Sequence, residues 1–172
     1  MVTCIIGLGN TEKYSGTRHN IGYDFLIWFC LKHNLTWKKK KNCSYAEYHH
    51  YGKIIYLCIS DTYMNSSGEI IPTIKNFFSV ATDMVVIHDD LELEYGFCKL
   101  RNNKERGLRS HNGLRSIAHY LNNDLPYFLS VGIGRPEHNE EVSVFVLKKF
   151  THLEMEKQQE IYAKIIYLLG LT

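Results

Sequence analysis

A short apolar run that ends in a glycine turn and leads into a long apolar segment constrains the fold of this chain more than any other feature. Residues 2–6 are rich in β-branched side chains and short enough for a buried strand, whereas residues 23–31 have the length and composition of a buried helix. The loop between them, residues 7–22, is dense in polar and titratable groups. Because sites in open α/β sheets lie outside the carboxyl ends of strands, this loop is the first candidate site.

Several interpretations of loop 7–22 compete. In the purely structural one, the glycines shape a strand-to-helix turn, Asn20 caps the helix and His19 lies on the surface. A dinucleotide-binding fingerprint needs a third glycine where Glu12 stands, and the chain contains no P-loop pattern. A single histidine between glycines does not decide among these interpretations, so the rest of the chain has to.

Strand-like and helical segments alternate along the chain. The further strand-like runs are residues 44–51 and 53–60, which form a hairpin around Gly52, and residues 84–87, 95–100 and 128–134. The further helical runs are residues 69–78, a segment from 112 onward, residues 142–150, and a last helix after the capping box of Thr151 and Glu154. This order predicts one α/β domain over residues 1–172, with a mixed, mostly parallel, twisted sheet and helices on both faces.

Two more polar clusters follow predicted strands. Loop 62–68 follows the hairpin, and its Asn65 and Ser66 could simply cap the next helix. The acidic segment 88–92 follows the buried strand 84–87, and suggests a metal site, a carboxylate partner for a histidine, or a polar turn. The ends of strands in a parallel sheet lie at one edge, so both clusters are expected close to His19.

Basic residues gather in two places. The first is the stretch before the helix at residue 112, which holds Lys99, Arg101, Lys104, Arg106, Arg109 and Arg115. Such a cluster suits phosphate groups, although the formal net charge of +2 is too small to establish a nucleic-acid partner by itself. The second is residues 37–41, which fit a solvated turn about as well as a phosphate contact.

Four motifs together resemble the signature of bacterial-type peptidyl-tRNA hydrolases, enzymes that cleave the ester between a peptide and tRNA. They are Gly-Leu-Gly-Asn with Thr-Arg-His-Asn-x-Gly in residues 7–22, Tyr-Met-Asn-Ser-Ser-Gly at 63–68, His-Asp-Asp-Leu-Glu-Leu at 88–93 and His-Asn-Gly-Leu at 111–114. Each motif is weak alone. They occur in the family's order, at about its spacings, over nearly the whole chain.

The resemblance implies a catalytic group of His19, Asp89 and Asn10, without a metal or other cofactor. His19 would take a proton from the attacking water, which suits an imidazole pKa of about 6.5, and Asp89 would orient its ring. No serine or cysteine stands in a nucleophile motif, so direct attack by water is the simpler mechanism. In the family, the residue that matches Asn10 helps to distinguish peptidyl-tRNA from aminoacyl-tRNA.

The resemblance also implies substrate contacts near the tRNA 3′ end, made by Tyr14, Tyr63, Asn65 and Asn112. Arg101 matches one of two basic residues that grip the tRNA 5′ phosphate, whereas the other position holds Ser130. The arginines that could replace the missing cation are Arg106, Arg109 and Arg135. The chain departs from the family in two loops: Thr11-Glu12-Lys13 replaces the usual Pro-Gly, and residues 102–109 replace a glycine-rich segment.

The expected setting is a cytoplasmic monomer whose partners are peptidyl-tRNA and tRNA. The five cysteines are scattered and form no metal-ligand spacing, so we expect reduced thiols, and neither a signal peptide nor a membrane span is expected. The main rival is a non-catalytic RNA-binding protein on the same fold. The presence of His19, Asp89 and Asn10 argues against it, because a pure binder needs no general base.

Overall fold

The computed structural model describes residues 3–78, 83–102, 111–122, 125–137 and 139–172. A seven-stranded sheet runs through the molecule in the order β2-β3-β4-β1-β5-β7-β6. Its strands are β1 (Cys4–Gly7), β2 (Lys38–Lys40), β3 (Cys43–His50), β4 (Lys53–Ser60), β5 (Met84–Asp90), β6 (Cys98–Arg101) and β7 (Tyr127–Gly132). The central strands β4, β1, β5 and β7 are mutually parallel, and β3 and β6 run antiparallel to them. The predicted mixed, mostly parallel sheet is confirmed.

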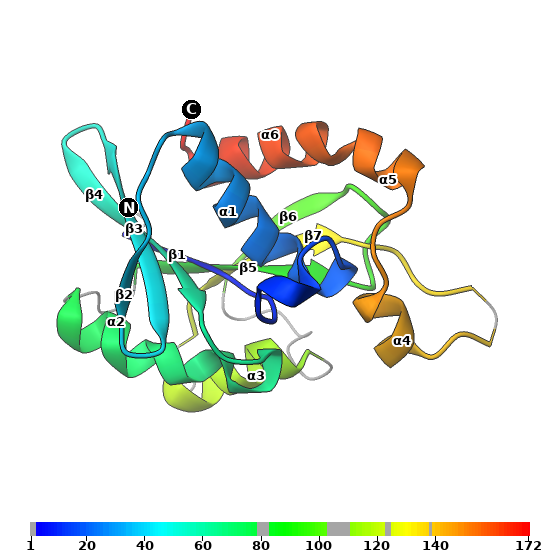
Figure 1. The fold of residues 1–172 in the computed structure, drawn as a ribbon, viewed down its shortest axis with the longest axis horizontal. Coiled ribbons are helices and arrows are strands. Elements are labelled where there is room, and N and C mark those ends of the chain that lie inside the picture. The colour runs from blue at the N-terminus through cyan, green and yellow to red at the C-terminus, as the bar shows by residue number, and fades with distance from the viewer. Residues whose placement is uncertain (1–2, 79–82, 103–110, 123–124, 138) are drawn as a thin grey trace.

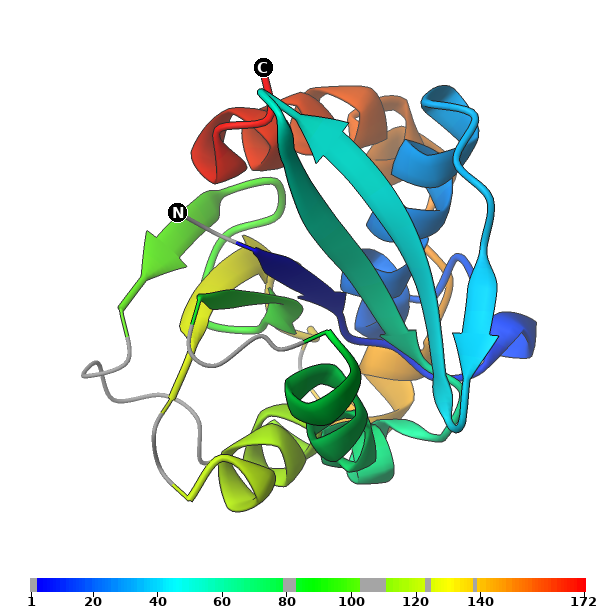
Figure 2. The same cartoon turned by 90° about the vertical axis from the view of Figure 1, so that its left-hand side faces the viewer.

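Helices cover both faces of this sheet, which twists from one edge to the other (Figures 1 and 2). The helices are α1 (Ile21–Lys32), α2 (Ile71–Phe77), α3 (Asn112–Tyr120), α4 (Val142–Leu147), α5 (His152–Glu156) and α6 (Gln158–Leu169). The 3-10 helices are η1 (Glu12–Tyr14), η2 (Arg18–Asn20) and η3 (Met64–Ile70). Helices α1 and α6 lie on one face, and α2 and α3 lie on the other.

The central strands are buried on both sides because each supplies side chains to two cores. In β5, Val85 and Ile87 pack with α1 and α6, whereas Met84 and Val86 pack with α2 and α3. Strands buried on both faces are expected to read as continuous apolar runs, which is how residues 84–87 read in the sequence. Full burial of each such side chain stabilises the fold by about 1.5–3 kcal/mol.

Several element boundaries differ from the sequence-based prediction. Residues 38–40 form the edge strand β2 instead of a turn, because they pair with β3, and two of their lysines bond Glu47 and Asp61. Exposed lysines on an edge strand oppose pairing with another chain. The predicted strand 95–100 shrinks to β6, because Gly96 adopts a positive φ of 83° in a turn.

The helices shift in a similar way. The predicted helix 69–78 is the 3-10 helix η3 followed by α2, with Pro72 in the first turn as expected. Helix α4 ends at Leu147, so Phe150 is buried beyond it. The capping box of Thr151 and Glu154 is confirmed. None of the described helices is long and apolar enough to cross a membrane.

Candidate active site

The candidate site lies at the carboxyl ends of β1, β4 and β5, where they meet the start of α3. The site can form there because α1 approaches β5 closely. A Cβ atom on Gly22 would lie 2.3 Å from the carbonyl oxygen of Ile87, so only glycine allows the first turn of α1 to rest there. The approach brings His19, just before α1, to Asp89, near the end of β5.

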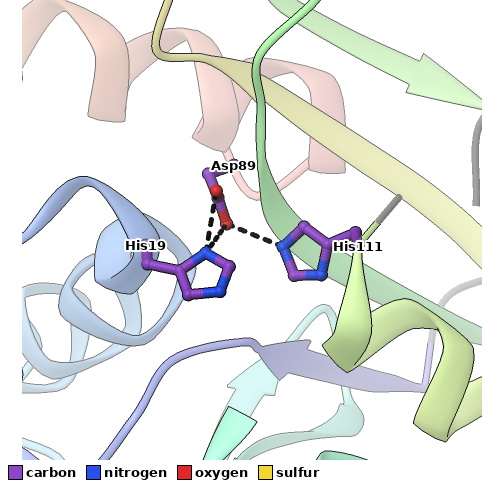
Figure 3. Close-up of side chains that lie close together, drawn as sticks. All are labelled: His19, Asp89 and His111. Carbon is purple, nitrogen blue, oxygen red and sulfur yellow. Dashed lines mark hydrogen bonds and ion pairs between the residues drawn. The ribbon is translucent and has the colours of Figure 1, made fainter. Parts of the chain in front are cut away.

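Two histidines share the Asp89 carboxylate (Figure 3). Nδ1 of His19 lies 3.0 and 2.9 Å from its two oxygens, and Nε2 of His111 lies 2.7 Å from Oδ1. The three side chains come from η2, β5 and the N-cap of α3, so three separate segments must be in place to assemble them. The predicted pairing of His19 with Asp89 is therefore present in the structure.

The charge state of Asp89 fixes the protonation of both rings. Burial alone would raise the pKa of Asp89, but the nearby charges and hydrogen bonds of His111 and His19 hold it far below its usual value. An ionised carboxylate only accepts hydrogen bonds, so Nδ1 of His19 and Nε2 of His111 carry the protons. Burial lowers the pKa of His19, but the charge of Asp89 and its hydrogen bond raise it by more, to a net increase.

His111 has no free ring nitrogen for acid–base work. Its Nε2–H donates to Asp89, and its Nδ1 accepts from the backbone N–H of Leu114 at 3.4 Å as the N-cap of α3. His19 differs, because its Nε2 points away from Asp89 (Figure 3) and its ring lines a cleft of about 280 Å³. Of the two rings that bond Asp89, that of His19 therefore keeps a nitrogen, Nε2, without a partner among the described residues.

A third histidine lies beneath this group. His88 is buried; its Nδ1 donates to the backbone carbonyl of Asp89 at 2.7 Å, and its Nε2 lies 3.0 Å from Oγ of Ser130. Burial, followed by the charge of His111, lowers the pKa of His88 to about 4, so it is neutral. Ser130 is 2% exposed, and no phosphate contact can come from this position.

Asn10 is held by a pair of hydrogen bonds that correct one prediction. Asn20 makes no side-chain cap to α1; its Oδ1 accepts from the backbone N–H of Asn10 at 2.8 Å, and its Nδ2 donates to the Asn10 carbonyl. The Asn10 side-chain oxygen accepts from the backbone N–H of Met64 at 2.8 Å. Its NH₂ group has no partner among the described residues, which leaves two donors for a ligand.

The other predicted substrate residues surround this centre. The rings of Tyr14 and Tyr63 meet edge to face with centroids 6.4 Å apart. Asn65 and Asn112 are exposed and line a groove between η3 and α3, and Asn112 also lines the cleft of His19. The structure therefore brings Asn112 to the cleft, and it places Asn65 beyond it.

The four arginines predicted to contact phosphate have different surroundings in the structure. Arg101 lines the cleft and forms an ion pair with Asp90 at 3.5 Å. Arg135 is exposed and pairs with Glu92. Arg106 and Arg109 lie outside the described residues. The roles of these four arginines stay predictions.

Two features of the site were missed in the sequence. His111 was assigned to a motif but not to the catalytic group, although its place at a predicted helix start was a usable signal. Arg18 is 6% exposed and donates two hydrogen bonds to Glu154, at 3.1 and 2.8 Å. It also stacks on the ring of Phe145 in α4, and so ties the wall of the cleft to the segment that carries His19. Because Arg18 and Glu154 are 136 positions apart, no local sequence pattern indicated that they would pair.

Among the described residues, His19, Asp89 and His111 are also the one group whose ligand-type atoms lie within 4.8 Å of one another, as a metal ion requires. Two imidazoles and a carboxylate form a donor set that zinc accepts. The N···O distances of 2.7–3.0 Å are nevertheless those of N–H···O hydrogen bonds, so protons fill the space between these atoms. The expectation of a metal-free site stays a prediction.

Comparisons with known proteins agree with the four motifs. The family model described as peptidyl-tRNA hydrolase matches residues 4–171. The peptidyl-tRNA hydrolase of Borrelia turicatae is 37% identical over 162 residues, which cover 92% of this chain and 84% of that protein. The enzyme of Rickettsia felis is 38% identical over 156 residues, which cover 88% and 83%. The crystal structure of peptidyl-tRNA hydrolase from Acinetobacter baumannii superposes with a TM-score of 0.83 at 30% identity, covering 94% of this chain and 83% of that one.

Proposed function

Because the chain belongs to the peptidyl-tRNA hydrolase family, we infer that it hydrolyses the ester bond of peptidyl-tRNA, releasing peptide and free tRNA. We propose that His19 is the general base of this reaction. The observation that carries the proposal is the geometry of its ring: Nδ1 bonds the Asp89 carboxylate, Nε2 points away from it (Figure 3), and the residue lines the cleft.

The reaction then follows from the protonation states. Nε2 of His19 takes a proton from a water molecule, whose oxygen attacks the carbonyl carbon of the ester. Asp89 stabilises the imidazolium that forms, as an aspartate does in hydrolytic triads. The tetrahedral intermediate collapses, the bond to the ribose oxygen breaks, and the proton on Nε2 passes to that oxygen. Positioned proton transfer of this kind contributes about 10²–10⁴ in rate.

His111 acts in this mechanism as a positioning residue. Its 2.7 Å hydrogen bond is a second N–H contact to the carboxylate of Asp89, next to that of His19, whose ring centroid lies 4.9 Å away. A carboxylate with two N–H donors keeps one orientation, so the His19 ring keeps one too. This arrangement also keeps Asp89 ionised, which the mechanism requires.

The asparagines fit the recognition of a blocked amine. The free NH₂ group of Asn10 can donate to the carbonyl oxygen of a peptide bond. An unblocked aminoacyl ester presents an ammonium group instead, which would face a donor and lose a hydrogen bond on desolvation. Asn112, at the edge of the same cleft, can bond the ribose or the attacking water. Tyr14 and Tyr63 supply aromatic faces beside Asn10.

The test compares an N-acetylated aminoacyl-tRNA with the same aminoacyl-tRNA left unblocked, with wild type, His19→Ala and His152→Ala. His152 is a matched control because its side chain is 91% exposed. We expect wild type and the control to cleave only the blocked ester, and His19→Ala to lose at least about 10²-fold in rate. Binding of tRNA without cleavage of either ester by wild type would establish the rival function, RNA binding without hydrolysis.

The setting of the enzyme belongs to the same proposal. We expect a cytoplasmic monomer that binds tRNA and needs no cofactor. The family supports the tRNA partner, because peptidyl-tRNA is its substrate. Size-exclusion chromatography with light scattering would measure the oligomeric state directly.

A further inference from the structure

Strand β5 reaches further toward the candidate site than its neighbour β1. It lies between β1 and β7 in the sheet, and its last pair with β1 joins Ile87 to Gly7. Beyond Ile87, β5 continues through residues 88–90, which pair with β7 but not with β1. On the side of β1, this end of β5 is therefore an open strand edge, and Asp89 lies in the middle of it.

An open strand edge leaves backbone carbonyls without a strand partner. Along a strand, the carbonyls of alternate residues point to the same neighbour. The carbonyl of Ile87 points toward β1, where it accepts from the backbone N–H of Leu8 at 3.0 Å. The carbonyl of Asp89 therefore points to the same side, where β1 has ended. Because Asp89 is buried, this carbonyl needs a donor from elsewhere in the protein.

The ring of His88 supplies that donor. Its Nδ1 lies 2.7 Å from the carbonyl oxygen of Asp89, and its Nε2 lies 3.0 Å from Oγ of Ser130. A carbonyl oxygen only accepts, so Nδ1 carries the proton, and Nε2 of the neutral ring accepts from the Ser130 hydroxyl. Ser130 is the residue that pairs with His88 across β5 and β7, so the register of the sheet places the hydroxyl at the ring. The imidazole is thus held at both nitrogens.

The surroundings of His88 keep its ring in place and neutral. The rings of His111 and Phe128 meet it edge to face, with centroids 5.4 and 6.2 Å away. The ionisable groups that act on it are His111, Asp89 and Asp90. Burial and then the charge of His111 lower the pKa of His88 to about 4, so the ring keeps one donor and one acceptor near neutral pH.

The contact of His88 bears on catalysis because it acts on the main chain of Asp89. Residue 89 is fixed on one side by its pairing with β7 and on the other by the His88 ring. A fixed backbone, together with two N–H donors at the carboxylate, leaves Asp89 one position relative to His19. Without the ring, the Asp89 carbonyl would turn toward another donor, and the carboxylate would move with it.

We propose that His88 is a positioning residue that takes the place of the missing strand neighbour of Asp89 and so holds the Asp89 carboxylate against His19. The proposal rests on the proposed function, because the rate that it controls is that of hydrolysis with His19 as the base. Ser130 belongs to the same chain of hydrogen bonds, since its hydroxyl orients the His88 ring.

Two amide substitutions of His88 separate hydrogen bonding from the filling of space. The amide nitrogen of asparagine can take the place of Nδ1, and that of glutamine the place of Nε2. His88→Asn therefore keeps a donor to the Asp89 carbonyl, whereas His88→Gln loses it although its side chain is larger. Ser130→Ala removes the hydroxyl that orients the ring. Val86→Ala is the matched control, because Val86 is fully buried on the same face of β5, two residues before His88.

Each protein is measured in three ways. Values of kcat and kcat/KM are taken against pH on N-acetylated aminoacyl-tRNA. The pKa of His19 is measured by NMR titration of its ring, whose signal is assigned by its absence from His19→Ala. This titration tests the position of Asp89 without turnover. Urea unfolding reports the stability of every variant.

We expect His88→Gln to lower kcat about tenfold or more and to lower the pKa of His19, because a displaced carboxylate stabilises the imidazolium less. His88→Asn should keep most of the wild-type rate and the wild-type pKa of His19. Ser130→Ala should change both quantities in the same direction as His88→Gln, but by less. Val86→Ala should lose stability and leave the pKa of His19 unchanged.

Equal effects of His88→Asn and His88→Gln would overturn the proposal, since they would give His88 a role in packing alone. A wild-type pKa of His19 in His88→Gln would overturn it as well, whatever the rate. If His88→Gln does not fold, Ser130→Ala decides: an unchanged rate and an unchanged pKa of His19 refute the proposal, and a lowered pKa supports it. Failure of wild type to cleave N-acetylated aminoacyl-tRNA would refute the proposed function instead, and the NMR titration would still test the contact.

Discussion

Replacing Gly22 with alanine tests whether the contact between α1 and β5 sets the catalytic geometry. The added Cβ would lie 2.3 Å from the carbonyl oxygen of Ile87, whereas ordinary contact begins at 3.4 Å. The first turn of α1 must therefore move away from β5 by about 1 Å. His19 immediately precedes that turn, and Asp89 follows Ile87 by two residues.

The displacement is large enough to break the pairing of His19 with Asp89. Their N···O distances of 2.9 and 3.0 Å would approach 4 Å, which is beyond hydrogen-bond range. A misplacement of about 1 Å costs roughly 10²-fold in rate. Overpacking at the contact should lower the free energy of unfolding by about 1–3 kcal/mol.

The pH profile separates this mechanism from simple destabilisation. Activity requires neutral His19, so kcat/KM rises with pH through the pKa of His19. In wild type, Asp89 raises that pKa above its usual value against the effect of burial. Without the hydrogen bond, the pKa falls, so Gly22→Ala should show a lower rate whose rise begins at lower pH.

The assay measures kcat/KM against pH on acetylated aminoacyl-tRNA, with urea unfolding as a second measurement. Phe29→Leu is a suitable control, because Phe29 is a fully buried residue of the same helix, away from the site. It should lose stability but keep its pH profile. If Gly22→Ala folds and keeps both the wild-type rate and the wild-type pH midpoint, the proposed dependence of His19 on this contact is refuted.

Four further substitutions test other contacts of the site. Asp89→Asn should lower kcat by about 10²–10⁴ and move the pH midpoint of kcat/KM downward, because it removes the charge that raises the pKa of His19; an unmoved midpoint would contradict this. His111→Ala should cost about tenfold in kcat and 1–3 kcal/mol of stability in urea unfolding, since it removes a donor to buried Asp89 and the N-cap of α3. Arg18→Met should lower the free energy of unfolding by about 3 kcal/mol, because it leaves Glu154 without its partner. Glu154→Gln should lower it as well, because it leaves the buried guanidinium of Arg18 without a counter-charge, and an unchanged stability of Glu154→Gln would argue against a charge effect.

The pairing at the centre of the site was predicted from the resemblance of four motifs to a known family, because each motif alone also fitted a structural turn or cap. Local patterns placed His19 after one apolar strand and Asp89 at the end of another, and parallel strands bring such ends together. The two-sided burial of β5 explains why that strand was easy to recognise. The same reasoning placed Asn112 at the start of α3.

The features that the sequence did not predict depend on contacts between distant segments, which local patterns do not encode. Asn20 was predicted to cap α1, but its side chain instead makes two hydrogen bonds to the backbone of Asn10. The lysines at 38–40 were predicted to lie in a turn, but they form a strand because they pair with the neighbouring strand β3. The contact of Arg18 with Glu154 depends on how α4 and α5 return to the first loop, which only the tertiary fold determines.

The contact of Arg18 with Glu154 has a consequence for the order in which the enzyme becomes active during its own synthesis. The backbone of residues 16–18 bonds residues 148–150, and Arg18 bonds Glu154, so the segment that carries His19 is held by residues made more than a hundred positions later. Chains emerge from the ribosome with the N-terminus first. A nascent chain that stops before residue 148 lacks these contacts, so we expect such a fragment to be inactive and to become a substrate for finished copies of the same enzyme.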